Sequence, residues 1–239
     1  MRKRLVRKSD LERLLSQVEP HPSPKPHLEQ YTIPVDVAAT ILYIAAYHYN
    51  DIIDRTVLDL GCGTGRLTLG AAFLGARLSL GLDTDNAAIQ VASANSVKTG
   101  LTENVQWVTG DLKAIHGTFD TILQNPPFGI QKRKADRKFL EKALDTGQRI
   151  YSLHKNPNKD RSLLRRLKAG QTKFAPSSPH PFIESFVKRQ AGEIQAVYTI
   201  LMKIPYMFEF HKKQRHDFLV DLYIIDGFRR PGHDNVLLQ

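Results

Sequence analysis

The strongest constraint on the fold is a regular alternation of short apolar runs and helical patterns that begins at Arg55. This alternation is typical of βαβ units, in which parallel strands form a sheet that helices cover on both faces. The expected strands are 56–60, 78–82, 105–108, 121–123 and 150–153, and the expected helices between them are 65–75, 85–98 and 136–148. Two final strands, at 193–204 and 217–226, leave no room for a crossover helix and should pair antiparallel.

The N-terminal region is expected to be organised differently. Ser9 and Glu12 form a capping-box pattern that predicts a helix to about Val18, and the prolines that follow predict an extended linker over 20–28. Thr32 can cap a further helix that begins near Pro34. We divide the chain into a basic N-terminal helix and proline-rich linker, a main domain with a basic surface insertion, and a tail, with bounds of 1–27, 28–230 with the insertion at about 155–180, and 231–239.

The overall charge favours a polyanionic partner. Lys and Arg number 34 against 24 Asp and Glu, which leaves a formal charge of +10 and favours nucleic acid before a membrane surface. No apolar run follows the basic start, so no secretory signal is expected, and no run is long enough to span a bilayer. The single cysteine, Cys62, fits a reducing compartment and is interpreted as a small apolar filler. We expect a cytoplasmic protein without a bound metal, since the histidines show no metal-binding spacing.

A glycine-rich loop joins the first strand of the alternation to the helix that follows it. Gly61, Gly63 and Gly65, with Thr64 among them, allow a sharp turn and a close approach of the backbone to a nucleotide-like ligand. Arg66 stands where a dinucleotide fingerprint has Gly or Ala, and the lysine of a P-loop is missing. NAD, FAD and nucleoside triphosphates therefore fit poorly.

Acidic residues end three successive strands of this region, at Asp59, Asp83 and Asp111. Asp83 can accept both hydroxyl groups of a ribose. Asp59 suits a cationic amino acid group, and Asp111 is placed to reach an adenine amine. S-adenosylmethionine carries these groups and no phosphate, so we expect it as the cofactor. The alternative is that the glycines only turn the chain and the acids only cap helices.

A second motif, Gln124-Asn-Pro-Pro-Phe128, follows the fourth strand at the carboxyl edge of the sheet. Pro126 and Pro127 fix the backbone and remove donors, so Asn125 and the Pro126 carbonyl can accept both hydrogens of a planar amine. This grip favours a pyramidal nitrogen with its lone pair aimed at a methyl group. Phe128 can stack on the base that carries the amine. The alternative is a rigid turn with a core phenylalanine.

With these motifs the chain resembles the methyltransferase-like enzymes that modify adenine in small-subunit ribosomal RNA, in particular their archaeal relatives. The resemblance covers 28 to about 225. The motifs that carry it are Leu28-Glu-Gln-Tyr-Thr32, Asp59-Leu-Gly-Cys-Gly-Thr-Gly65, Asn125-Pro-Pro-Phe-Gly129, Ala135-Asp-Arg-Lys-Phe-Leu140, Tyr151-Ser-Leu-His-Lys155 and Phe210-His-Lys-Lys213.

The resemblance implies a class I S-adenosylmethionine-dependent methyltransferase fold, which is Rossmann-like, with a mostly parallel seven-stranded sheet and a final antiparallel pair. It implies that Gln30 and Thr32, with Tyr31 between them, fold over the methionine end of the cofactor. It also implies that Asp83 holds the ribose and that Asp111 and the Leu112 backbone read the adenine. Eukaryotic members work with a small zinc-containing activator protein, so such a partner is expected here. The basic insertion is a departure from the family.

Two basic clusters lie in loops next to the predicted site, and some of their residues are expected on the rim of the same pocket. They are Lys132, Arg133 and Lys134, and His211, Lys212 and Lys213. They can neutralise RNA phosphates, which would make binding salt-dependent; the alternative is a merely solvated basic face. A base must be unstacked before its amine is methylated, so a single-stranded or helix-end nucleotide is expected.

The sequence therefore predicts an RNA methyltransferase that acts on the exocyclic amine of an adenine in small-subunit ribosomal RNA. One alternative is N5-methylation of a glutamine in a translation release factor, although the aromatic residue of that motif is commonly Tyr. An alternative of another class is a non-catalytic RNA-binding factor in ribosome assembly.

Overall fold

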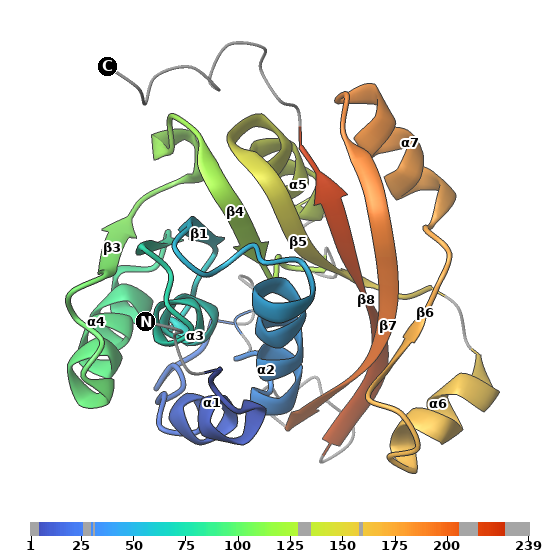
Figure 1. The fold of residues 1–239 in the computed structure, drawn as a ribbon, viewed down its shortest axis with the longest axis horizontal. Coiled ribbons are helices and arrows are strands. Elements are labelled where there is room, and N and C mark those ends of the chain that lie inside the picture. Colours follow the sequence, from blue (N-terminus) through green and yellow to red (C-terminus); the bar gives the residue numbers. More distant parts are fainter. Residues whose placement is uncertain are drawn as a thin grey trace.

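A computed structural model describes residues 5–25, 30, 32–128, 135–157, 160–205 and 215–227. One eight-stranded sheet runs through the molecule in the order β3-β2-β1-β4-β5-β8-β7-β6 (Figure 1). Strands β1 to β5 are parallel, whereas β8, β7 and β6 each pair antiparallel with their neighbours. The strands are β1 Thr56–Leu60, β2 Leu78–Asp83, β3 Val105–Thr109, β4 Phe119–Gln124, β5 Gly147–Lys155, β6 Phe174–Pro176, β7 Glu193–Pro205 and β8 Arg215–Asp226.

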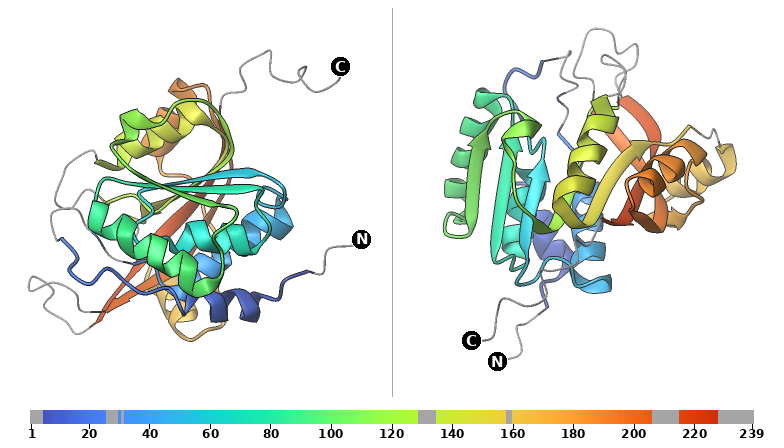
Figure 2. Two further views of the ribbon diagram at one scale, coloured as in Figure 1. Left: turned by 90° about the vertical axis from the view of Figure 1, so that its left-hand side faces the viewer. Right: turned by 90° about the horizontal axis from the view of Figure 1, so that it is seen from above.

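Helices cover both faces of this twisted sheet (Figure 2). Helices α1, α2 and α3 contribute to one hydrophobic cluster, and α5 and α7 contribute to another on the opposite face. The helices are α1 Lys8–Leu15, α2 Val35–Tyr43 with a π-helical turn Ile44–His48, α3 Arg66–Phe73, α4 Asn86–Thr99, the 3₁₀ turn Leu112–Ala114, α5 Ala135–Thr146, α6 Arg161–Lys168 and α7 Pro181–Arg189. Among the described residues, no helix is both long and apolar enough to cross a membrane.

The alternation predicted from the sequence is confirmed, but the expected count of seven strands is wrong. All of the predicted strands are present within a few residues, and the final pair, β7 and β8, is antiparallel. The eighth strand, β6, comes from the basic insertion and pairs with β7 at the edge of the sheet. Its three residues end in a proline and show no apolar alternation, so the sequence carries no strand signal there.

The two predicted side-chain caps in the N-terminal region are also wrong. Helix α1 begins at Lys8 with Arg7 as its cap, so Ser9 lies inside the helix. Helix α2 is preceded by Pro34, not by a capping Thr32. Burial decides where α1 begins, since Leu11 and other leucines of α1 pack into the cluster that α2 and α3 share. Tertiary packing thus outweighs the local capping signal.

Candidate active site

The glycine loop leaves β1 beside the point where the Asn-Pro-Pro-Phe motif leaves β4. In the parallel pairing of these two strands, Leu60 lies opposite Gln124. Gly61 and Asn125 are therefore the first residues beyond neighbouring strands, which lie about 4.8 Å apart in a sheet. The structure brings the two predicted motifs together at the carboxyl edge.

The three glycines of the loop all have left-handed backbone angles, with φ of +72°, +55° and +87° for Gly61, Gly63 and Gly65. A Cβ atom on Gly65 would lie 2.4 Å from the Trp107 ring, and one on Gly61 would lie 2.9 Å from the Phe139 ring. A Cβ on Gly63 would meet no atom within 4 Å. Two glycines are thus required by packing, and the middle one leaves open space next to the backbone, as a ligand cradle requires.

Asp83 is fixed at the end of β2 by the loop it faces. One carboxylate oxygen accepts a hydrogen bond of 2.9 Å from the Gly63 amide, and the other accepts one of 2.9 Å from the Asp85 amide. Burial raises the pKa of Asp83 above its usual value. The side chain is only half-buried, so it keeps acceptor capacity toward the open space at Gly63. A carboxylate in this position fits the ribose of S-adenosylmethionine.

Asp59 lies underneath the loop. It is 1% exposed, and one carboxylate oxygen accepts hydrogen bonds from both the amide and the hydroxyl of Thr68, at 3.1 and 2.7 Å. Burial raises the pKa of Asp59 to about 7, although the hydrogen bonds from Thr68 oppose this shift. Asp59 therefore ties α3 to β1, and any attraction for a cationic group acts through the loop above it.

Asp111 and Leu112 follow β3, the next strand along the same edge. Asp111 is exposed, and its carboxylate accepts a hydrogen bond of 3.0 Å from the Lys113 amide, which caps the 3₁₀ turn. This capping role is the one that the alternative interpretation assigned to it. The Gly110 amide just before these residues donates to the Asp83 carbonyl at 2.9 Å, so Asp111 and Leu112 lie next to the end of β2.

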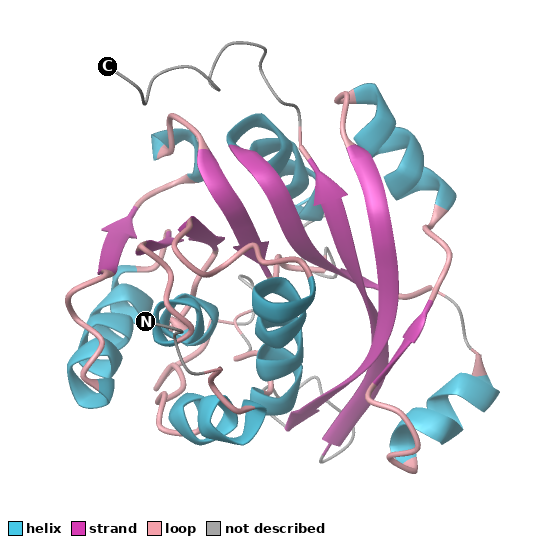
Figure 3. Ribbon diagram, viewed as in Figure 1, coloured by secondary structure: helices cyan, strands magenta, loops and turns pink. Residues whose placement is uncertain are grey.

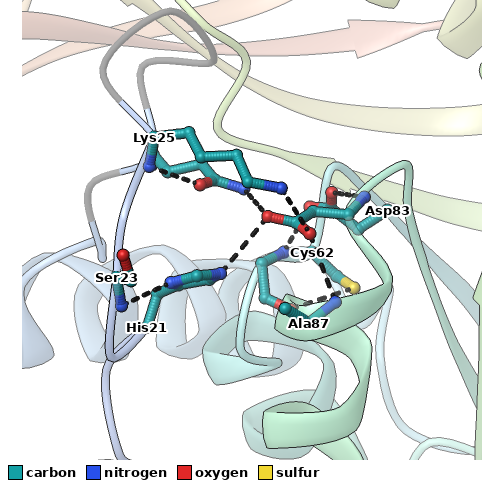
Figure 4. A network of polar contacts seen from close by, with 9 residues as sticks. His21, Ser23, Lys25, Cys62, Asp83 and Ala87 are labelled. Atoms are coloured by element: carbon teal, nitrogen blue, oxygen red, sulfur yellow. Dashed lines mark hydrogen bonds and ion pairs between the residues drawn. The ribbon is translucent and has the colours of Figure 1, made fainter.

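A segment from the N-terminal region lies against the glycine loop and the start of α4. We call the described residues between Val18 and Ile33 the strap; they contain no helix or strand (Figure 3). Its centre of attachment is Asp85, the N-cap of α4, which accepts hydrogen bonds from Lys25 at 3.0 Å and from Gln30 at 2.8 Å (Figure 4). His21 Nε2 lies 3.3 Å from the same carboxylate. His21 Nδ1 accepts a hydrogen bond of 3.0 Å from the Ser23 amide.

Charge and hydrogen bonding make Asp85 a strong acceptor. Burial raises its pKa, but the hydrogen bonds from Gln30 and Lys25 outweigh that effect and bring the pKa of Asp85 to about 2. Because the Asp85 amide also bonds Asp83, the strap is linked through one residue to the predicted ribose carboxylate. Gln30 was predicted at this site, but Asp85 was missed because an acidic helix cap carries no ligand signal in a sequence.

Two further side chains fasten the strap. Arg66 donates to the carbonyls of Ile33 and Val18 at 2.6 and 3.0 Å. Asn95, which is buried, accepts from the Glu19 amide at 3.0 Å and donates to the carbonyls of Glu19 and Thr64 at 3.1 and 3.0 Å. The arginine that breaks the dinucleotide fingerprint thus holds both ends of the strap beside the glycine loop.

The Asn-Pro-Pro-Phe motif presents a buried acceptor. Among the described residues, the buried Oδ1 atom of Asn125 has no hydrogen-bond partner. Pro126 is buried and Pro127 is half-buried. Phe128 is half-buried and packs edge-on against Phe218, with ring centroids 5.7 Å apart. The motif thus holds a buried acceptor that has no donor among the described residues, beside a half-buried phenylalanine.

A buried polar chain supports this motif from below. Gln124 donates to the Ser152 hydroxyl at 2.7 Å, and that hydroxyl lies 2.8 Å from Nε2 of His154. Burial lowers the pKa of His154 to about 4, so its imidazole is neutral at pH 7. Ser152 and His154 belong to the Tyr-Ser-Leu-His-Lys motif, and they hold the residue that precedes Asn125. The sequence indicated the motif but not its connection to Gln124.

The remaining predicted residues have simpler outcomes. Thr32 is half-buried and Thr64 is buried. Cys62 is buried and its thiol pKa is raised by burial, which agrees with a packing role. No group of three metal-ligating side chains occurs in the part of the chain that the structure describes. Seven predicted site residues lie outside the described residues and stay predictions: Tyr31, Lys132, Arg133, Lys134, His211, Lys212 and Lys213.

The fold and this site together define a class I S-adenosylmethionine-dependent methyltransferase. A magnesium protoporphyrin IX methyltransferase from Synechocystis with bound S-adenosylhomocysteine shares the fold, with a TM-score of 0.58 over 92% of this chain at 16% identity. A crystal structure of a proposed RNA methyltransferase from Pyrococcus horikoshii is more similar, with a TM-score of 0.77 at 30% identity over 95% of this chain and all of that one.

Sequence comparison gives the family. The model of the methyltransferase small domain matches residues 34–154. An uncharacterized Methanocaldococcus jannaschii protein is 36% identical over 93% of this chain and 95% of its own length. The rRNA N(6)-adenosine-methyltransferases of Danio rerio and Drosophila melanogaster are 32% and 31% identical, each over 89% of this chain and more than nine-tenths of their own lengths. The chain belongs to the methyltransferase small domain family and, within it, to the family of these rRNA methyltransferases.

Proposed function

We propose that this chain transfers a methyl group from S-adenosylmethionine to the exocyclic amine of an adenine in small-subunit ribosomal RNA. The observation that carries the proposal is the buried Asn125 Oδ1 atom, which has no donor among the described residues and lies at the edge where the glycine loop begins. A buried acceptor without a donor costs about 1–3 kcal/mol. The N–H group of a planar amine satisfies it.

The roles of the residues follow from this placement. Gly61, Gly63 and Thr64 form the backbone cradle, Asp83 accepts from the ribose, and Asp111 with the Leu112 amide recognises the adenine of the cofactor. Asp59 supports the loop from below. Gln30 and Thr32, together with Tyr31, cover the methionine end. The cofactor supplies an electrophilic methyl group on its sulfonium.

The catalytic motif handles the acceptor amine. Asn125 Oδ1 and the Pro126 carbonyl each accept one hydrogen bond from the amine. These two hydrogen bonds oppose delocalisation of the nitrogen lone pair into the ring and direct the lone pair toward the methyl group. Pro127 keeps the backbone of the motif rigid, and Phe128 stacks on the base that carries the amine. Most of the rate enhancement then comes from positioning, since no covalent enzyme intermediate is needed.

Ribosomal RNA is the proposed substrate because relatives of nearly full length bear that activity in their names. The proposed partner surfaces for RNA include Lys132, Arg133 and Lys134, and His211, Lys212 and Lys213. The archaeal branch is proposed because the Methanocaldococcus jannaschii relative is more similar than the animal ones. We also propose a cytoplasmic location. A small zinc-containing activator is proposed as a partner on the basis of the family resemblance alone, and co-purification tests it.

Methyl transfer from labelled cofactor tests the proposal directly. Small-subunit ribosomal RNA and a translation release factor are offered separately, and modified adenosines are mapped by mass spectrometry. We expect label in the RNA at N6 of one adenosine. Label in the release factor alone would favour glutamine methylation instead, and label in neither would favour a non-catalytic assembly factor.

A further inference from the structure

Strands β7 and β8 extend beyond the strands beside them. Strand β5 ends at Lys155, opposite Val220 of β8, and β6 pairs with β7 only as far as Ile200. Within the described residues, the ends 201–205 and 215–219 pair with each other and with no third strand. We call these two ends the arm. At roughly 3.3 Å per residue, the arm reaches about 15 Å beyond β5, on the carboxyl side of the sheet where the Asn-Pro-Pro-Phe motif lies (Figure 1).

One face of the arm is supported by the basic insertion. A pair of strands without further neighbours is only marginally stable in water, so the arm needs packing partners on its faces. Leu201 and Leu219 lie opposite each other in the arm and are buried against Leu167 of α6. Lys168, at the end of α6, also pairs with Asp217 of the arm at 3.0 Å. Helix α6 therefore braces this face.

The other face of the arm packs on the N-terminal helices. Met202 and Phe218 lie opposite each other, one position along from the two leucines, so their side chains point to the other face of the sheet. Met202 is buried in the cluster that α1, α2 and α3 share, and Phe218 packs against that cluster. Helices α2 and α6 both contact β7. The arm is thus held between α2 and α6, and the insertion lies on the face opposite to Phe218.

Phe218 connects the arm to the catalytic motif. Its ring meets that of Phe128 at 88°, with centroids 5.7 Å apart, which is the edge-to-face arrangement that aromatic rings favour. Pro126 and Pro127 fix the backbone before Phe128, but the ring can still rotate about its side-chain bonds. Contact with Phe218 favours one of these orientations. The orientation of the Phe128 ring therefore depends on the position of the arm.

We propose that Phe218 is a positioning residue, which orients the Phe128 ring for stacking on the target base, and that α6 keeps Phe218 in place by bracing the arm from the opposite face. The inference rests on the proposed function for the role of Phe128. It gives the insertion a part in substrate recognition without any contact between the insertion and the substrate.

The test is a double-mutant cycle in the full chain. Phe218→Leu removes the ring but keeps an apolar side chain, and it is made both alone and together with Phe128→Leu. Phe73→Leu is the matched control, because Phe73 is also a half-buried phenylalanine that packs against the same cluster but lies on α3. The kcat and the KM for small-subunit ribosomal RNA are measured at a temperature where thermal melting shows every variant to be folded.

We expect Phe218→Leu to raise the KM for RNA about fivefold, at the lower end of the effect of losing one base stack, with kcat unchanged. In the Phe128→Leu background the same change should have no further effect, because the ring through which it acts is gone. Phe218→Tyr, which keeps the ring, should restore the original KM. Leu167→Ala, which leaves a cavity beneath the arm, should raise the KM about threefold and should add nothing to Phe218→Leu.

A measurement without catalysis separates this inference from the proposed function. In a chain labelled with 4-fluorophenylalanine, the fluorine resonance of Phe128 is assigned by its loss in Phe128→Leu. Phe218→Leu and Leu167→Ala should each shift this resonance, since both change the surroundings or the support of the ring. Phe73→Leu should leave it in place.

Several outcomes would overturn the positioning role: an unchanged Phe128 resonance in Phe218→Leu, a KM raised as much by Phe73→Leu, or an effect of Phe218→Leu that is as large in the Phe128→Leu background as alone. Failure of the proposed function is recognised separately. In that case the Phe128 resonance responds to Phe218 and to Leu167 as expected, while the unaltered chain methylates no adenosine.

Discussion

The two ends of the candidate site differ in how their carboxylate and amide oxygens are satisfied, although the buried Thr64 hydroxyl at the cofactor end also has no partner within the described residues. At the cofactor end, the carboxylates of Asp83 and Asp85 already accept hydrogen bonds from the loop, from α4 and from the strap. At the catalytic end, the side-chain oxygens of Gln124 and Asn125 have no partner within the described part of the chain. The cofactor end is thus assembled by the protein itself, whereas the catalytic end leaves an acceptor for the substrate, as a preorganised site should.

The largest effect is expected at the catalytic end, when the acceptor oxygen of Asn125 is removed. Asn125→Ala removes the unsatisfied acceptor, so methyl transfer to RNA should fall by about 10²–10³-fold, the usual range for loss of one preorganised hydrogen-bonding group. Affinity for S-adenosylhomocysteine, measured by calorimetry, should stay within a few-fold of the original value. Asn104→Ala, at an exposed turn, is the matched control. Full activity of Asn125→Ala would remove this residue from the mechanism.

The second prediction concerns His154, in the buried polar chain that supports Gln124 at the catalytic end. The pKa of His154 is about 4 in the folded chain against 6.5 unfolded, so protons bind preferentially to the unfolded chain as the pH falls. The folded state should lose about 3 kcal/mol of stability between pH 6.5 and 4 from this group. His154→Gln should lose correspondingly less over that interval in urea unfolding. His116→Gln, at an exposed position, should behave like the unaltered chain; equal pH dependence of both variants would refute the assignment.

The third prediction concerns the cofactor end, where Arg66 holds the strap. Arg66→Leu leaves the carbonyls of Val18 and Ile33 without their donor, which should lower the free energy of unfolding by about 2 kcal/mol. Because the strap also contacts Asp85, affinity for S-adenosylhomocysteine should fall about tenfold at a temperature where the variant is folded. Arg13→Leu, whose parent side chain is 75% exposed, is the control. Unchanged cofactor affinity in Arg66→Leu would show that the strap is independent of the site.

The smallest effect on cofactor affinity is expected from the ion pair between Lys25 and Asp85. Lys25→Met removes one of the contacts to Asp85, and Lys25 is half-exposed, so the ion pair contributes no more than about 1 kcal/mol. Affinity for S-adenosylhomocysteine should weaken two- to fivefold at low salt, and less at high salt. Lys188→Met, which removes the i,i+4 partner of Glu184 on α7, should have no effect on affinity. A salt-independent loss would contradict an electrostatic role for Lys25.

The same contrast explains what the sequence could predict. Strand positions, the glycine loop and the Asn-Pro-Pro-Phe motif are local patterns, and the parallel pairing of β1 with β4 brings the two motifs together without further information. The strap contacts are different, because Arg66 and Val18 are 48 residues apart and Asn95 and Glu19 are 76 apart. No local periodicity reports such pairs.

The misses within the insertion and near α1 have another cause. Strand β6 exists because β7 offers it an edge to pair with, and α6 is held by Leu201 and Leu219 from strands that come later in the chain. The start of α1 is set by burial of Leu11 and its neighbours rather than by Ser9. In each case the deciding interaction is tertiary.

The position of β8 has a consequence for how the chain is completed during synthesis. This last strand inserts between β5 and β7, and it brings Phe218 against Phe128 and Tyr223 against His154. A nascent polypeptide without β8 already contains the glycine loop and the Asn-Pro-Pro-Phe motif. It has neither Phe218, the packing partner of Phe128, nor Tyr223, the packing partner of His154. Maturation of the catalytic end is therefore postponed until β8 has been synthesised and has paired with β5.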